Sequence, residues 1–175
     1  MTTFEALIKN RRSIRKYLDK SIETEKVDAI LRTALMSPAS KRANGWEFIV
    51  VDQRETLVKL AACREVGSKF VADAPLAIVV AYDTEKCDVW YEDASIAAII
   101  IQLAAADLDL GSCWVQVHNR TYNDTTTSEA YVRDLLQIPH NYHVLCMITI
   151  GYKDEERKPY DVEKLAYDKI HYNKF

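Results

Sequence analysis

Residues 91–107 constrain the fold most, because a helix over this segment is apolar on nearly every face. Its most apolar part, residues 96–106, is interrupted only by Gln102 and falls short of the ~20 residues that a membrane-spanning helix needs. A helix without a polar face must be surrounded by protein, and a small domain can hardly enclose it alone. We therefore predict a buried helix with no membrane role, covered in part by a second, twofold-related copy of the chain.

The composition is that of an ordinary globular protein. The 175 residues, of which 49% are hydrophobic and 28% charged, fit a single domain over residues 1–175. The formal net charge of −3 provides no positive field for a polyanion, so nucleic-acid binding is disfavoured. Four widely separated cysteines are expected to be reduced thiols. The start of the chain lacks the pattern of a signal peptide, which favours a cytoplasmic location.

The hydrophobic periodicity predicts a mixture of helices and strands. A helix capped by Thr3 should end at Asn10, and a second helix over residues 23–36 should stop at Ser37 and Pro38, before a polar loop at residues 39–45. Further helices are expected over residues 55–62, 91–107 and 129–136, and strands over residues 48–51, 76–81, 113–117 and 144–150. Because these elements do not alternate strictly, we predict an α+β fold with helices packed on one small sheet.

A basic run follows the first predicted helix. Arg11, Arg12, Ser13, Ile14 and Arg15 concentrate three guanidinium groups and a hydroxyl in five residues. Arginine forks and serine hydroxyls match the several acceptor oxygens of a phosphomonoester. The run therefore indicates a phosphate site, although such clusters also occur as solvated surface charge.

Four ordered motifs together resemble the nitroreductase family, whose members carry FMN on a dimeric α+β fold. The first is the run Arg-Arg-Ser-Ile-Arg-Lys-Tyr at residues 11–17, and the second is the Ser-Pro loop and Trp-containing strand entry at residues 37–48. The third joins the apolar helix to Gly-Ser-Cys-Trp at residues 111–114, and the last is Ile-Gly-Tyr at residues 150–152. The resemblance runs from residue 4 to about residue 171 and implies a small, mainly antiparallel sheet and an intertwined homodimer.

The resemblance implies a set of FMN contacts in the first half of the chain. Arg11, Arg12 and Ser13 would approach the FMN phosphate, and Arg15 would approach the isoalloxazine ring. From the partner subunit, the implied contacts are Pro38, Ala39, Ser40 and Asn44. Arg42 and Gly45 depart from the family, where many relatives have Asn and Pro.

A second set of contacts is implied after the apolar helix. Backbone groups following Gly111 would lie near the reactive edge of the flavin, at Cys113, Trp114, Val115 or Gln116, and Gly151 would form the closing turn. Cys113 invites a nucleophile hypothesis, but a cysteine between apolar neighbours is more typical of a packed residue. For the last phosphate cation, Lys158 is our first choice and Arg157 the second; a solvated lysine is the alternative.

Other cofactor patterns are absent from the sequence. The histidines His118, His140, His143 and His171 show no ligand spacing of the His-Glu-x-x-His kind, so no metal site is expected. The chain also contains no Gly-x-Gly-x-x-Gly or Walker-type loop, which disfavours a Rossmann nicotinamide site.

The function implied by the resemblance is an FMN-dependent oxidoreductase. NADH or NADPH would deliver a hydride to FMN, which would then reduce a small acceptor such as a nitroaromatic or quinone. Because the flavin N5 does the chemistry, no protein acid or base is obligatory, and Arg15 would stabilise the charge of the reduced ring. The alternatives are a flavin storage or sensing module with little turnover, a dehalogenase-like or flavin-destroying enzyme on the same fold, and a flavin-free structural dimer.

Overall fold

The computed structural model describes residues 3–175, which fold around a four-stranded antiparallel sheet. The strands are β1 (Trp46–Val51), β2 (Leu76–Asp83), β3 (Gly111–Gln116) and β4 (Tyr142–Gly151), in the spatial order β1-β2-β4-β3. β2 and β4 lie at the centre, and every residue of β2 is buried. This confirms the predicted α+β class and its small antiparallel sheet.

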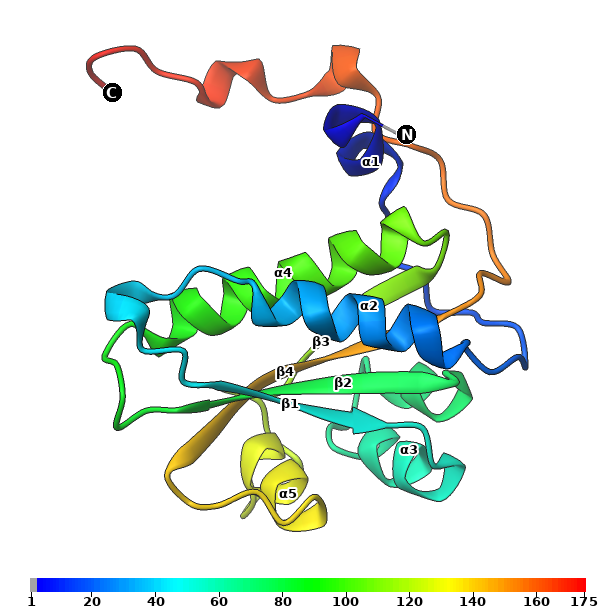
Figure 1. The fold of residues 1–175 in the computed structure, drawn as a ribbon, viewed down its shortest axis with the longest axis vertical. Coiled ribbons are helices and arrows are strands. Elements are labelled where there is room, and N and C mark those ends of the chain that lie inside the picture. The colour runs from blue at the N-terminus through cyan, green and yellow to red at the C-terminus, as the bar shows by residue number, and fades with distance from the viewer. Residues whose placement is uncertain (1–2) are drawn as a thin grey trace.

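Helices cover both faces of the sheet (Figure 1). α2 (Thr24–Leu35) and α4 (Trp90–Asp107) pack on one face, and α3 (Arg54–Ala61) and α5 (Ser128–Leu135) pack on the other. The alternation of side chains along the strands supplies both layers: Ile78 and Val80 contribute to the first core, and Ala77 and Val79 to the second. The predicted helices and strands therefore all exist, and their ends differ from the predicted ones by at most two residues.

The N-terminal segment returns to the edge of the sheet after α1 (Phe4–Asn10), whose first turn is capped by Thr3 as predicted. Ser13 pairs with Ser112 at the start of β3, and Tyr17 pairs with Lys153 just beyond β4. Because β3 and β4 are antiparallel, Gly111 lies opposite Gly151. Three distant segments of the chain therefore meet at one corner of the sheet.

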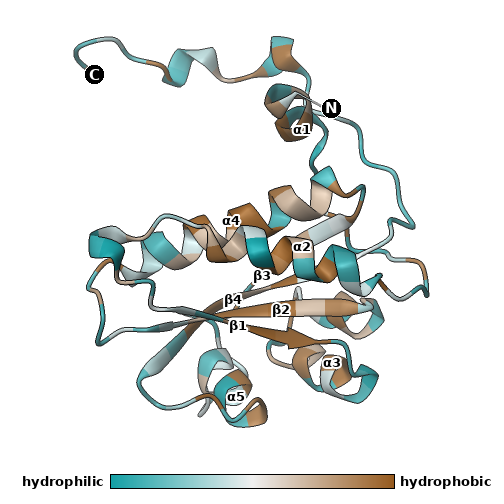
Figure 2. Cartoon of the chain, in the orientation of Figure 1, coloured by the Kyte–Doolittle hydropathy of each residue, from teal (hydrophilic) through white to brown (hydrophobic). Residues whose placement is uncertain are grey.

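α4 is buried on one side only. Ala94, Ala98, Ile101 and Ala105 are fully buried against the sheet, whereas Ile96 and Ile99 on the opposite side remain 37% and 36% exposed. Figure 2 shows apolar colouring along most of this helix and the strands beneath it. Among residues 3–175 no helix is long and apolar enough to cross a membrane. The outer side of α4 is therefore an apolar surface that its own chain leaves open.

The C-terminal segment runs past α1 and extends away from the sheet (Figure 1). The Tyr160 amide donates to the Lys9 carbonyl at 2.9 Å, which fixes the start of this segment. Beyond it are two short 3₁₀ turns, Val162–Lys164 and Tyr167–Lys169. The segment exposes large apolar side chains, including Leu165, Ile170 and Phe175. An extended arm of this kind buries little surface against its own chain.

Gly151→Ala is expected to destabilise the fold. A Cβ at Gly151 would lie 2.7 Å from the Tyr17 ring and 2.8 Å from Pro75, closer than van der Waals contact allows. Overpacking of this kind costs about 1–3 kcal/mol. Urea unfolding should show the loss, while the variant Lys153→Ala, at an exposed neighbouring position, should unfold like wild type. Equal stability of all three proteins would contradict the tight contact with Tyr17.

Candidate functional site

A cavity of about 800 Å³ opens at the corner where the three segments meet. Its walls come from the end of α1, the basic run, the last turn of α4, the start of β3 and the segment after β4. The residues lining it are Leu7, Asn10, Arg11, Arg12, Ile14, Ala106, Asp107, Asp109, Leu110, Gly111, Ser112 and Lys153–Arg157. A volume of this size is typical of cofactor and small-molecule sites.

A smaller cavity of about 230 Å³ lies beside the first and concentrates positive charge. Arg11, Arg12, Ser13, Arg15, Arg157 and Tyr160 line it. The fold thus brings to one cavity the residues that the resemblance assigns to a phosphate, Arg11, Arg12 and Ser13. It brings Arg15, which the resemblance assigns to the flavin ring, to the same cavity. Guanidinium groups and a hydroxyl around one cavity are a donor set suited to phosphate oxygens.

Glu155 organises this corner, and no pattern in the sequence marks it. Its Oε1 accepts from the Arg15 amide at 2.6 Å and from the Lys16 amide at 3.2 Å, and its Oε2 lies 2.6 Å from Arg157 Nη2. The hydrogen bond from the Arg15 backbone amide, together with the charge of Arg157, lowers the pKa of this carboxyl below its usual value. Glu155 therefore links the basic run to the segment after β4 and holds Arg157 in position.

The two candidate phosphate cations after β4 lie differently. Arg157 lines both cavities. Lys158 lines neither, and its backbone carbonyl accepts a hydrogen bond from Arg12 Nη1. Arg12 also lies 4.7 Å from the centre of the Tyr160 ring. The geometry therefore favours Arg157 as the side chain that can reach a ligand beside Arg11, with Lys158 helping to orient Arg12.

The four residues that the resemblance implies after Gly111 alternate between buried and partly exposed along β3. Trp114 and Gln116 are partly exposed, and Trp114 Nε1 donates to Gln116 Oε1 at 2.9 Å. Cys113 and Val115 are each only 1% exposed, so neither residue is open to a ligand within one chain. Burial raises the pKa of the Cys113 thiol, although nearby Arg15 and Ser13 oppose the shift. A protonated, buried thiol agrees with a packed residue better than with a nucleophile.

Close packing explains why a glycine stands at position 151. It is buried beneath Tyr17 and Pro75 and does not line either cavity. The Tyr17 hydroxyl contacts the Thr149 hydroxyl at 2.7 Å, which holds the N-terminal segment on β4. The role that the structure shows for this glycine is therefore to admit the Tyr17 ring.

The loop with Pro38, Ala39, Ser40 and Asn44 lies at the other end of α4. The Ser40 amide donates to Asp93 Oδ1 at 2.9 Å, and the Tyr82 hydroxyl donates to Asp93 Oδ2 at 2.8 Å. Asp93 is in the first turn of α4, whereas the cavity is lined by Ala106 and Asp107 in the last. At 1.5 Å per residue these ends are roughly 20 Å apart, so in one chain the loop does not reach the cavity.

Within this loop, the backbone is unusual. Lys41, Arg42 and Asn44 have φ values of 53°, 55° and 45°, in a region that favours glycine. A 3₁₀ turn at Ser40–Arg42 replaces the plain loop expected from the sequence. Its anchor Asp93 is only 3% exposed, and an acidic residue in the first turn of a helix would by itself be expected only to favour the helix start. The contacts show a more specific role, since Asp93 fixes the shape of the loop.

Glu155→Gln should change how stability depends on pH. The pKa of Glu155 is lowered in the folded protein, so its contribution is complete above its usual value of about 4.5 and is lost as pH falls through the folded value. Urea unfolding at several pH values between about 7 and 3 should give a wild-type advantage that is largest near neutrality and shrinks below pH 4.5. A wild-type advantage independent of pH would contradict the charged role of this carboxyl.

Comparisons with known proteins agree with this architecture. The model of a family described as "Nitroreductase family" matches residues 8–65 and 61–152. An FMN-dependent nitroreductase from Clostridium difficile R20291 superposes with a TM-score of 0.95 at 54% identity, over 97% of this chain and 98% of the other. A protein of Archaeoglobus fulgidus, named "Putative NADH dehydrogenase/NAD(P)H nitroreductase", is 34% identical over 97% of each chain.

A third relative spans the whole chain. A protein of Methanothermobacter thermautotrophicus with the same name is 36% identical over 100% of this chain and 88% of its own length. The chain therefore belongs to the nitroreductase family and has the nitroreductase fold.

Proposed function

We propose that this protein is an FMN-dependent oxidoreductase that uses NADH or NADPH to reduce a small acceptor such as a nitroaromatic or a quinone. The observation that carries the proposal is the arginine-lined corner, where Arg11, Arg12, Ser13 and Arg157 line two neighbouring cavities. The donor set fits the phosphate of FMN. The names of the relatives, one FMN-dependent and others NAD(P)H nitroreductases, agree with this chemistry.

The residues of the chain bind and orient the cofactor. Arg11, Arg12, Ser13 and Arg157 hold the phosphate, and Glu155 keeps Arg157 and the backbone of Arg15 in register. Bound FMN supplies the ring that accepts and donates the hydride. The guanidinium of Arg15 would stabilise the negative charge of the reduced ring. Residues 1–175 act as one cytoplasmic FMN-binding domain.

We further propose that two copies of the chain complete each site. The cavity and the loop with Pro38, Ala39, Ser40 and Asn44 lie at opposite ends of α4 within one chain. A twofold partner packed on the open face of α4 brings its loop toward the cavity of the first chain. The exposed Ile96 and Ile99 and the apolar C-terminal arm supply the surface for such an interface.

The two candidate phosphate cations can be separated by mutation. Arg157→Ala should weaken FMN binding by roughly 10- to 100-fold, because it removes a charge-assisted contact. Lys158→Ala should have at most a small effect, since the contact made by Lys158 is through its backbone carbonyl. Fluorescence titration of the apoprotein with FMN measures both. A larger loss in Lys158→Ala than in Arg157→Ala would reverse the assignment.

Reduction by nicotinamide tests whether the protein is an enzyme. NADH or NADPH added without oxygen should bleach the flavin absorbance of the holoprotein rapidly, and a nitroaromatic or quinone should restore it. Intact FMN that neither coenzyme bleaches would instead support a storage or sensing module. A colourless protein that does not take up FMN would support a structural dimer and contradict the proposal.

A further inference from the structure

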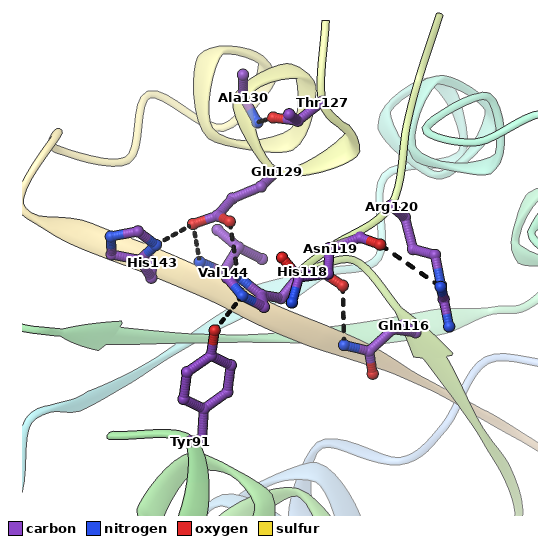
Figure 3. A network of polar contacts seen from close by, with 10 residues as sticks. All are labelled: Tyr91, Gln116, His118, Asn119, Arg120, Thr127, Glu129, Ala130, His143 and Val144. Atoms are coloured by element: carbon purple, nitrogen blue, oxygen red, sulfur yellow. Dashed lines mark hydrogen bonds and ion pairs between the residues drawn. The ribbon is translucent and has the colours of Figure 1, made fainter. Parts of the chain in front are cut away.

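Three side chains converge on one point (Figure 3), at the opposite end of β3 and β4 from the basic run. They are His118, just after β3; Glu129, in the first turn of α5; and His143, near the start of β4. One ligating atom from each lies within 4.8 Å of the other two. His118 Nδ1 is 2.9 Å from Glu129 Oε2, and His143 Nδ1 is 2.7 Å from Glu129 Oε1.

The hydrogen bonds of this cluster are incomplete. Glu129 Oε1 accepts from the Val144 amide at 3.1 Å, which fixes the carboxylate against β4. His143 Nδ1 is buried and close to the same oxygen, yet it makes no hydrogen bond of acceptable geometry among the residues that the structure describes. Buried polar atoms normally have a partner, and a bound ion is one explanation for an exception.

The groups match the ligands of a transition-metal cation. Two imidazole nitrogens and one carboxylate form a three-ligand set used for zinc, with bonds of about 2.0–2.2 Å. Around such a tetrahedral ion, adjacent ligand atoms are roughly 3.3–3.6 Å apart. Each His–Glu pair therefore has to open by about 0.4–0.9 Å, and the most distant pair of ligand atoms, up to 4.8 Å apart, has to close by about 1.2–1.5 Å. The exposed fraction of the His143 side chain is 40%, so the cluster has both a route to solvent and a ligand that can adjust.

The surroundings of His118 support ligation through Nδ1. Its other ring nitrogen, Nε2, contacts the Tyr91 hydroxyl at the start of α4. Histidines bound to metals almost always use the second ring nitrogen to contact such a polar group, which fixes the orientation of the ring. Trp90 packs beside both imidazoles, with ring centroids 5.0 Å from His118 and 5.2 Å from His143. The orientation of the His118 ring is therefore set before any ion binds, whereas the more exposed His143 ring can adjust.

We propose that His118, Glu129 and His143 form a zinc site that ties α5 and the end of β3 to the start of β4. The sequence suggested no metal site because the three residues are 11 and 14 positions apart, and only the fold brings them together. The four cysteines do not compete for the ion, because all are buried. The site is independent of the proposed flavin chemistry, and its loss leaves the basic run unchanged.

Calorimetric titration of the chelator-treated, flavin-loaded protein with zinc chloride tests the site. Wild type should bind one zinc per chain. His143→Ala should weaken binding by at least 100-fold, and Tyr91→Phe by about 10-fold with unchanged stoichiometry. His140→Ala is the matched control, since it removes an exposed histidine three residues away. Its titration should match that of wild type.

Two further measurements identify the ligands. The extended X-ray absorption fine structure at the zinc edge should show nitrogen and oxygen neighbours, with scattering from two imidazoles and no sulfur. Zinc at about 100 times its Kd should raise the unfolding midpoint of wild type by roughly 5–10 °C, and His143→Ala should show no such shift. The proposal is wrong if wild type shows no saturable zinc site, if His143→Ala binds like wild type, or if sulfur coordinates the ion.

Discussion

Ile99→Glu is expected to convert the protein into monomers and weaken FMN binding by at least roughly 100-fold. Ile99 lies on the open, apolar side of α4, which we propose as the centre of the dimer. Burying an unpaired carboxylate there costs several kcal/mol. Because part of each FMN site is assigned to the partner, dissociation should release the cofactor. Sedimentation velocity with detection at the flavin absorbance measures both effects together.

Val58→Glu is the matched control for this variant. Val58 is 50% exposed on α3, on the opposite face of the sheet, so the same type of substitution meets solvent there. The control should remain dimeric and keep its FMN. An Ile99→Glu protein that is still a flavin-loaded dimer would show that α4 is not the interface, and a monomer with full FMN affinity would show that one chain completes the site.

Arg15→Leu should lower the reduction potential of bound flavin and slow its reduction by NAD(P)H about 10- to 100-fold. Arg15 is the member of the basic run that we assign to the ring, and its charge favours the anionic reduced state. Loss of one charge-assisted contact is worth roughly 1.5–3 kcal/mol, which corresponds to about one to two decades in rate. Stopped-flow reduction at saturating FMN separates reactivity from occupancy.

Arg11→Ala is the comparison for Arg15→Leu. Arg11 lines both cavities and is assigned to the phosphate, so its loss should weaken FMN binding while leaving the reduction rate of bound flavin nearly unchanged. Arg15 lines only the smaller cavity, beside Ser13, and its assignment to the ring comes from the resemblance to the family. If Arg15→Leu leaves both potential and rate unaltered, Arg15 has no role at the ring and is a solvated arginine.

The sequence predicted the fold well because its signals were local. The period of apolar residues located α2 and α4, and β-branched runs located β2 and β4. The apolar faces of residues 91–107 also indicated a surface that one chain leaves open, and Ile96 and Ile99 lie on it. Strand order and register could not be predicted from local sequence patterns, because strand pairing depends on contacts between distant segments.

The candidate site was predicted only in part, for the same physical reason. Arg11, Arg12, Ser13 and Arg15 are contiguous, so their shared chemistry was visible in the sequence. Glu155 acts through contacts with residues about 140 positions away, and nothing in its neighbourhood marks it.

The choice between the neighbouring Arg157 and Lys158 likewise depended on backbone geometry. Their charges are alike, and only the course of the chain after β4 decides which side chain faces the cavity.

Paired titrations of the apoprotein with FMN and with riboflavin test the central claim most directly, because the two ligands share the ring and differ in the phosphate. If Arg11, Arg12, Ser13 and Arg157 hold that phosphate, several charge-assisted contacts are lost with riboflavin. FMN should then bind at least roughly 100-fold more tightly, with one FMN per chain. Equal affinities for FMN and riboflavin, or no saturable binding of either, would contradict the account.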